Sequence, residues 1–186
     1  MMISLSWLEL KPNEIEHGNQ EYFEDYFPRI NSKEEYKHIP ESVFEQWIHP
    51  HHHNWGTLRN YAWIDYEKVI FHEQDWTFEQ LVSVNVFSEF MDYYLSRTQF
   101  DDFGSFCLGK KNLSFWKQKG TWQTPPIILD VNSLKEKPPA WSEITRPYQL
   151  VEGHTRVGHL HSMKRVSDLK RGQIADTHKI WLMKQV

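Results

Sequence analysis

Short runs of apolar residues, separated by polar turns, divide this chain into brief predicted elements. Loose alternation over residues 3–10 predicts a strand that stops at the Lys11-Pro12-Asn13 corner. Apolar runs bounded by turn residues predict further strands at 66–71, 127–129, 148–151 and 177–183. Strands interspersed with helical segments in this way favour an α+β fold, a mixed α/β architecture with a small mixed sheet.

Helical spacing is clearest over residues 77–97. Thr77 precedes Gln80 by three residues, the arrangement of a capping box, and an apolar face follows it. The pattern also predicts helices at 19–27 (ended by Pro28), at 40–48 (ended by Pro50) and from 154 to about 166. The segments at 101–123 and 132–141 are rich in Gly, Lys or Pro and are predicted to be irregular.

The segment from residue 147 to 166 predicts a strand, a tight glycine turn and a helix in succession. Gly153 can adopt backbone conformations that are closed to other residues, and Thr155 can cap the helix. A strand that enters a helix in this way directs free N–H groups and the positive end of the helix dipole at one point. Arg156 adds a planar guanidinium suited to phosphate. The turn therefore predicts a phosphate-binding site.

The run Glu152-Gly153-His154-Thr155-Arg156, followed by a helix, resembles the signature of the ParB/sulfiredoxin-like superfamily. Residues 124–130, where two prolines precede an apolar strand, resemble another strand of that family. Residues 3–13 resemble its N-terminal strand and Leu-x-Pro-Asn corner. The resemblance covers about residues 3–14 and 124–183. It implies a single domain over residues 1–186, with a large, mainly helical insertion at 15–123.

The chain departs from two branches of this superfamily. His154 stands where sulfiredoxin needs a reactive cysteine, and the single cysteine, Cys107, lies far from the turn in sequence. Reduction of sulfinic acids is therefore not expected. Chromosome-partition ParB proteins carry a Gly-Glu-Arg-Arg turn and an Asn-Pro-Arg element that this chain lacks. With Val186 as the last residue, we also expect no helix-turn-helix domain.

The resemblance implies a nucleotide pocket at the mouth of the glycine turn. Residues 153–156 and Asn13 of the N-terminal corner would hold the phosphates, and Mg²⁺ with ATP or CTP would be the cofactor. Glu152, Glu14 and His154 are the candidate catalytic groups, because such side chains can hold a metal–nucleotide complex or take a hydroxyl proton. Related families include ATP- and CTP-hydrolysing proteins, a free-serine kinase and nucleases. The resemblance thus implies phosphoryl-transfer or phosphodiester chemistry without selecting one reaction.

Charge is distributed unevenly along the chain. The net charge is −4, but residues 146–186 carry eight basic and three acidic residues, against 13 basic and 22 acidic residues in the remainder. The basic C-terminal segment suits a nucleotide or a nucleic acid, and the acidic, aromatic insertion suits a protein partner. A second class of function therefore stays open, namely a non-catalytic interaction module of the antitoxin, immunity or plasmid-transfer-inhibition type.

The amino-acid composition limits the classes of protein to which this chain can belong. Aromatic residues make up 15% of the 186 residues, with nine Trp, which supplies ample apolar area for a packed core. Histidines at 49, 51, 52 and 53 are a possible set of metal ligands, but consecutive histidines on a loop cannot all face one ion, so we predict that these histidines form no metal site. No apolar run approaches the roughly 20 residues of a membrane helix. The lack of a basic secretory leader and the single cysteine suit a cytoplasmic protein.

Overall fold

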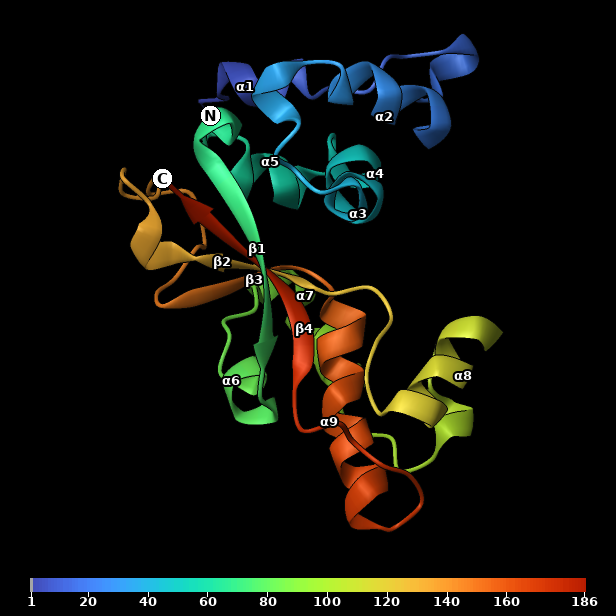
Figure 1. Ribbon diagram of the computed structural model, residues 1–186. Helices are drawn as coiled ribbons and strands as arrows, with labels where there is room; N and C mark the ends of the chain where they lie inside the picture. Colours follow the sequence, from blue (N-terminus) through green and yellow to red (C-terminus); the bar gives the residue numbers. More distant parts are fainter. Residues whose placement is uncertain (1) are drawn as a thin grey trace. The chain divides into compact units, whose positions relative to one another are not determined.

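The sheet has four strands in the order β1-β4-β2-β3. They are β1 (Val69–Trp76), β2 (Ile127–Asp130), β3 (Tyr148–Glu152) and β4 (His178–Gln185). The computed structural model describes residues 2–186, and Figure 1 traces the strands and helices along them. Helices outnumber strands, so the predicted α+β class with a small sheet is confirmed. β2 and β3 are antiparallel, with Ile127 opposite Glu152 and Asp130 opposite Tyr148.

The contacts within the chain define two compact units. Unit 1 comprises residues up to Phe71 together with Ser133–Ile144 and Met183–Val186, and unit 2 comprises His72–Asn132 and Thr145–Leu182. The predicted single domain with an insertion at 15–123 stays a prediction.

Unit 2 is built around the long helix α9 (His154–Asp168). Val157, Leu160 and Met163 recur at helical spacing, are fully buried, and share a core with Ile180 and Leu182 of β4. Figure 1 shows α9 in orange beside β4 in red. The other helices of the unit are α6 (Phe78–Val82), α7 (Ser88–Ser96) and α8 (Lys110–Lys119).

Unit 1 is mostly helical and packs around aromatic rings. Its helices are α1 (Leu5–Glu9), α2 (Phe23–Asn31), α3 (Glu41–Val43), a π-helical turn (Phe44–Ile48), α4 (His49–His51) and α5 (Trp55–Tyr61). Trp7 of α1 lies at the centre, with ring centroids 6.0 Å from Trp47, 4.6 Å from His52 and 5.1 Å from Tyr66.

Short 3₁₀ turns occur in both parts of the chain, at Glu16–Gly18, Glu34–Tyr36, Tyr66–Lys68, Phe103–Ser105 and Val131–Ser133.

The strand predicted over residues 3–10 is wrong, because this segment forms α1. Trp7 and Leu10, three residues apart, are both fully buried, whereas a strand would turn them to opposite faces. Ser4 caps the helix through its side-chain oxygen, which accepts a hydrogen bond from the Trp7 N–H at 3.1 Å. Tertiary burial of the Trp7 indole therefore selects the helix.

The predicted ends at Pro28 and Pro50 are also wrong. Pro28 lies inside α2, where it deprives the Glu24 carbonyl of its helical partner, but Glu24 is exposed and water can solvate it. Pro50 lies in α4, which continues without a break from α3 and the π-helical turn, so it stands inside one helical run from Glu41 to His51. Both helical runs therefore extend past the predicted stops, to Asn31 and His51.

The single helix predicted at 77–97 is two helices, α6 and α7, although the capping box of Thr77 and Gln80 is present. Between the two helices, the backbone of Asn85 pairs with a strand of the sheet. The Asn85 N–H donates to the Tyr148 carbonyl and the Leu150 N–H donates to the Asn85 carbonyl, both at 2.9 Å. Asn85 therefore extends the edge of β3 instead of continuing a helix.

The segment predicted to be irregular at 101–123 contains the helix α8. Trp116 is almost fully buried and fixes this helix against the core of unit 2. Gly120 ends it with a φ of +66°, and a side chain there would lie 2.4 Å from the Gln173 carbonyl oxygen.

Candidate functional site

The glycine turn has the predicted strand–turn–helix geometry. β3 ends at Glu152, Gly153 has a φ of +104° and a ψ of 21°, and α9 begins at His154. A side chain at position 153 would place its Cβ 2.5 Å from the Cβ of Pro126, which is closer than carbon atoms can approach. Both the positive φ and the close approach of Pro126 therefore require glycine at this position.

Arg156 folds back over this turn. Its Nη2 lies 3.7 Å from Glu152 Oε1, and its side chain is about 20% exposed. Burial lowers the pKa of the Arg156 guanidinium, an effect that the charge of Glu152 opposes, and the group remains a cation because a guanidinium is not deprotonated in proteins. A positive charge therefore stands in the first turn of α9, where the helix dipole is itself positive and the turn holds no acidic residue.

A cavity of about 120 Å³ lies beside Arg156. Its lining joins α8, the segment that leads into β2, and the first turn of α9. The lining residues are Leu108, Asn112, Trp116, Trp122, Gln123, Thr124, Thr155 and Arg156. One guanidinium, two threonine side chains and two amide side chains thus meet two largely buried indole rings, a combination that suits a small anion.

Thr155 does not cap α9, and the prediction that it can is wrong. The N-cap is Gly153, which has no side chain to donate or accept. The Thr155 hydroxyl instead hydrogen-bonds the Tyr93 hydroxyl of α7 at 2.8 Å. This bond fixes the Thr155 side chain at the rim of the cavity.

His154 is the first residue of α9 and is 8% exposed. Its ring lies against Phe90, with centroids 4.6 Å apart. The imidazole therefore helps to pack α7 on the start of α9, and its assignment as a catalytic group stays a prediction.

Asn13 and Glu14 belong to unit 1 and line a different cavity there, of about 360 Å³, with Lys11 and His53 among the other lining residues. The Asn13 N–H and side-chain amide donate to the two carboxylate oxygens of Glu21, at 2.7 and 3.1 Å. A joint pocket of this corner with the glycine turn stays a prediction.

Glu21 gives Asn13 a structural role. Glu21 is 6% exposed, and its carboxylate forms a salt bridge with Arg29. Burial alone would raise the pKa of Glu21, but hydrogen bonds from Arg29 and Asn13, and the charge of Arg29, lower it below its ordinary value. Asn13 therefore stabilises a buried carboxylate at the N-terminal corner.

Part of the histidine run at 49–53 packs in the interior of unit 1. His52 stacks on Trp7 and hydrogen-bonds the Trp7 carbonyl at 2.8 Å through Nε2. Among residues 2–186, no group of three His, Cys, Asp or Glu side chains is arranged to hold a metal ion. Binding of Mg²⁺ together with ATP or CTP stays a prediction.

Sequence reasoning missed the contribution of α8 to the cavity. Asn112 and Trp116 line it four residues apart, on one face of a helix that the Gly- and Lys-rich composition concealed. The signal that could have revealed this helix is Leu113 and Trp116 at helical spacing before Gly120, a residue typical just beyond a helix end.

Comparisons of the chain with protein-family models, curated proteins and solved structures find no match in any of the three. The resemblance to the ParB/sulfiredoxin-like superfamily therefore stays a prediction. None of the described helices is long and apolar enough to span a membrane.

Proposed function

We propose that this protein binds a phosphate-bearing ligand of the nucleotide class at the amino end of α9. The observation that supports this is the Arg156 guanidinium beside the first turn of α9, at the edge of a cavity. A cation at the positive end of a helix dipole is unfavourable unless a negative charge lies near it. Glu152 supplies one such charge, and a phosphate group would supply a second with better hydrogen-bonding geometry.

The size of the cavity limits what enters it. Pockets for small organic ligands usually occupy about 300–1,000 Å³. At about 120 Å³, this cavity accommodates a phosphoryl group, while the sugar and base would lie outside it. Thr124 and Thr155 can donate hydrogen bonds to phosphate oxygens, and the buried indoles of Trp116 and Trp122 form the apolar part of the lining.

The chemistry that would follow binding depends on Glu152. Mg²⁺ in nucleotide sites is usually held by one or two carboxylates and by the phosphates themselves. Glu152, 3.7 Å from Arg156, is the carboxylate in the turn that could take this role. We therefore propose ATP or CTP with Mg²⁺ as the ligand, and hydrolysis or transfer of a phosphoryl group as the reaction class.

Removal of the Arg156 guanidinium should weaken nucleotide binding. For Arg156→Ala we expect a loss of roughly 1.5–3 kcal/mol, or about 10- to 100-fold in affinity, because a charge-assisted hydrogen bond to phosphate disappears. Calorimetry with ATP, CTP, GTP and ADP, each with Mg²⁺, and with inorganic phosphate measures the effect.

Arg165→Ala is the matched control, because Arg165 is an exposed arginine of the same helix whose Nη2 donates to the Thr98 carbonyl. It should leave the affinity unchanged. Failure of the wild-type protein to bind any of these ligands at millimolar concentration would exclude the proposed function. Equal binding by wild type and Arg156→Ala would move the nucleotide site away from this turn.

A further inference from the structure

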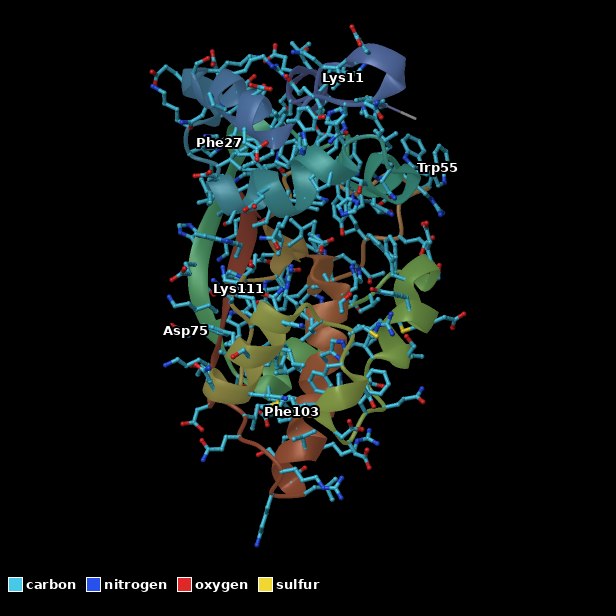
Figure 2. The ribbon with its side chains drawn as sticks, turned by 90° about the vertical axis from the view of Figure 1, so that its right-hand side faces the viewer. Lys11, Phe27, Trp55, Asp75, Phe103 and Lys111 are labelled. Carbon is cyan, nitrogen blue, oxygen red and sulfur yellow. The ribbon has the colours of Figure 1, made fainter. Side chains whose placement is uncertain are left out.

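Two of the nine tryptophans are exposed, and both belong to unit 1. Trp55 is 65% exposed and Trp141 is 42% exposed, whereas the other indoles are buried or half-buried. Figure 2 shows Trp55 projecting from the edge of its helix, away from the packed interior of unit 1. A large aromatic ring exposed to water does not gain the free energy that burial would supply. Tryptophan is enriched at the centres of protein interfaces.

Hydrogen bonds join the two segments of the chain that carry Trp55 and Trp141. Trp55 and Arg59 lie four residues apart in α5, so their side chains are neighbours on one face of the helix. Arg59 Nε donates to the Trp141 carbonyl at 2.7 Å, and its Nη1 contacts the Glu143 carboxylate at 2.8 Å. Arg59 therefore connects α5, which carries Trp55, to the segment that carries Trp141.

Asn60 strengthens this connection. Its side-chain oxygen accepts from the Glu143 N–H at 2.8 Å and from the Ser142 hydroxyl at 3.2 Å. Trp63 donates its indole N–H to the Asn60 carbonyl at 2.7 Å, which anchors the end of α5. The backbone that presents Trp55 and Trp141 is thus fixed before any partner arrives, which lowers the entropic cost of binding.

We propose that Trp55 and Trp141 form a docking surface for a basic protein segment, whose arginine or lysine side chains lie over the two indoles. The surface is independent of the phosphate site of unit 2. Indole faces attract cations, and Arg59 does not oppose them because Glu143 offsets its charge. Unit 1 as a whole carries nine basic and 14 acidic residues, a net charge of −5, which attracts a basic partner and repels an acidic one.

Indole N–H signals provide a direct test, because each of the nine tryptophans gives one signal in a ¹⁵N–¹H NMR spectrum. Trp55→Phe and Trp141→Phe assign the two relevant signals. The full chain is then titrated with three peptides that share a backbone and differ in charge, (Arg-Pro)₄, (Ser-Pro)₄ and (Glu-Pro)₄. We expect the Trp55 and Trp141 signals to shift with (Arg-Pro)₄ alone and to saturate with one common dissociation constant.

Alanine substitutions separate this surface from general electrostatic attraction. Trp55→Ala and Trp141→Ala should each weaken (Arg-Pro)₄ binding about tenfold or more, as at interface hot spots. Tyr22→Ala, which removes another exposed aromatic ring of unit 1, should leave it unchanged.

Three results would overturn the proposal. One is that neither indole signal moves with millimolar (Arg-Pro)₄. Another is an equal shift with (Ser-Pro)₄, which would point to a neutral proline-rich partner. The third is a shift of both signals on dilution of the protein alone, which would identify the surface as a contact between copies of this chain.

Discussion

Acidification from pH 7 to pH 4 is expected to unfold this protein. Three histidines, His52, His159 and His178, are at most 3% exposed, and burial lowers the pKa of each to about 4. Each has at least one ring nitrogen with no hydrogen-bond partner, and His159 has two. A proton added to such a ring would be a buried charge without an acceptor, so the folded state holds these histidines neutral.

The sign of the effect follows from proton linkage. In the unfolded chain a histidine has its ordinary pKa of about 6.5, so the unfolded state binds protons before the folded state does. Stability is therefore highest above pH 6.5 and falls as the pH is lowered towards 4. With a folded-state pKa of about 4, each histidine contributes roughly 3 kcal/mol of stability at pH 7 that is lost by pH 4. Lost together, these contributions are as large as the 5–15 kcal/mol by which proteins are usually stable.

Urea unfolding at a series of pH values between 7.5 and 4.5 measures this dependence. His159 stacks on Phe106, with centroids 4.5 Å apart and an interplanar angle of 12°, so His159→Phe should be tolerated as a ring-for-ring exchange. In this variant, the slope of the free energy of unfolding against pH should be smaller by up to about 1.4 kcal/mol per pH unit, which is the value for one proton. His72→Gln, at an exposed position, should leave the slope unchanged. A stability that does not vary between pH 7 and pH 4.5 would contradict the neutral, buried histidines.

Substitution of Gly153 should destabilise the protein strongly. In Gly153→Ala the new Cβ must share space with the Cβ of Pro126, 2.5 Å away, and an alanine must adopt a φ of +104°. The backbone conformation costs about 1–2 kcal/mol and the overpacking about 1–3 kcal/mol, so we expect a loss of about 2–5 kcal/mol. Urea unfolding at neutral pH measures it.

Gly109→Ala is the control for this prediction. Gly109 has a φ of −59°, and no atom outside its immediate chain neighbours lies within 4 Å of a Cβ built there. Its replacement should change the free energy of unfolding by less than about 1 kcal/mol. Equal stability of the two variants would show that the turn can relax, and that the close contact with Pro126 does not constrain it.

The sequence predicted the local geometry of the candidate site well, because that geometry rests on interactions between near neighbours. Tyr148–Glu152 is a strand, Gly153 takes the left-handed conformation and α9 follows at once, as expected from an apolar run, a glycine and helical spacing. The capping box of Thr77 and Gln80 is likewise a contact across three residues, and it is present.

The lining of the site could not be predicted in this way. Asn112 and Trp116 reach the cavity from a helix some 40 residues before Arg156, and no local pattern links the two segments. The pairing of Asn13 with Glu21 and Arg29 also depends on how the N-terminal corner folds. Side chains that meet only after folding leave no periodic trace in the sequence.

Where the sequence and the structure disagree, long-range contacts outweighed the local pattern. Residues 3–10 alternate like a strand, but burial of Trp7 among aromatic rings requires a helix. The apolar spacing over residues 77–97 predicts one continuous helix, but the backbone of Asn85 pairs with β3 and interrupts that helix. The sequence by itself thus determined the glycine turn at Gly153 and the capping box of Thr77 and Gln80, since each depends on a few adjacent residues, and the succession of strand and helix patterns indicated the α+β class. The tertiary structure decided which segments are helical and which side chains surround Arg156, because burial of a large ring or pairing of a strand edge outweighs the fraction of a kcal/mol that separates local preferences.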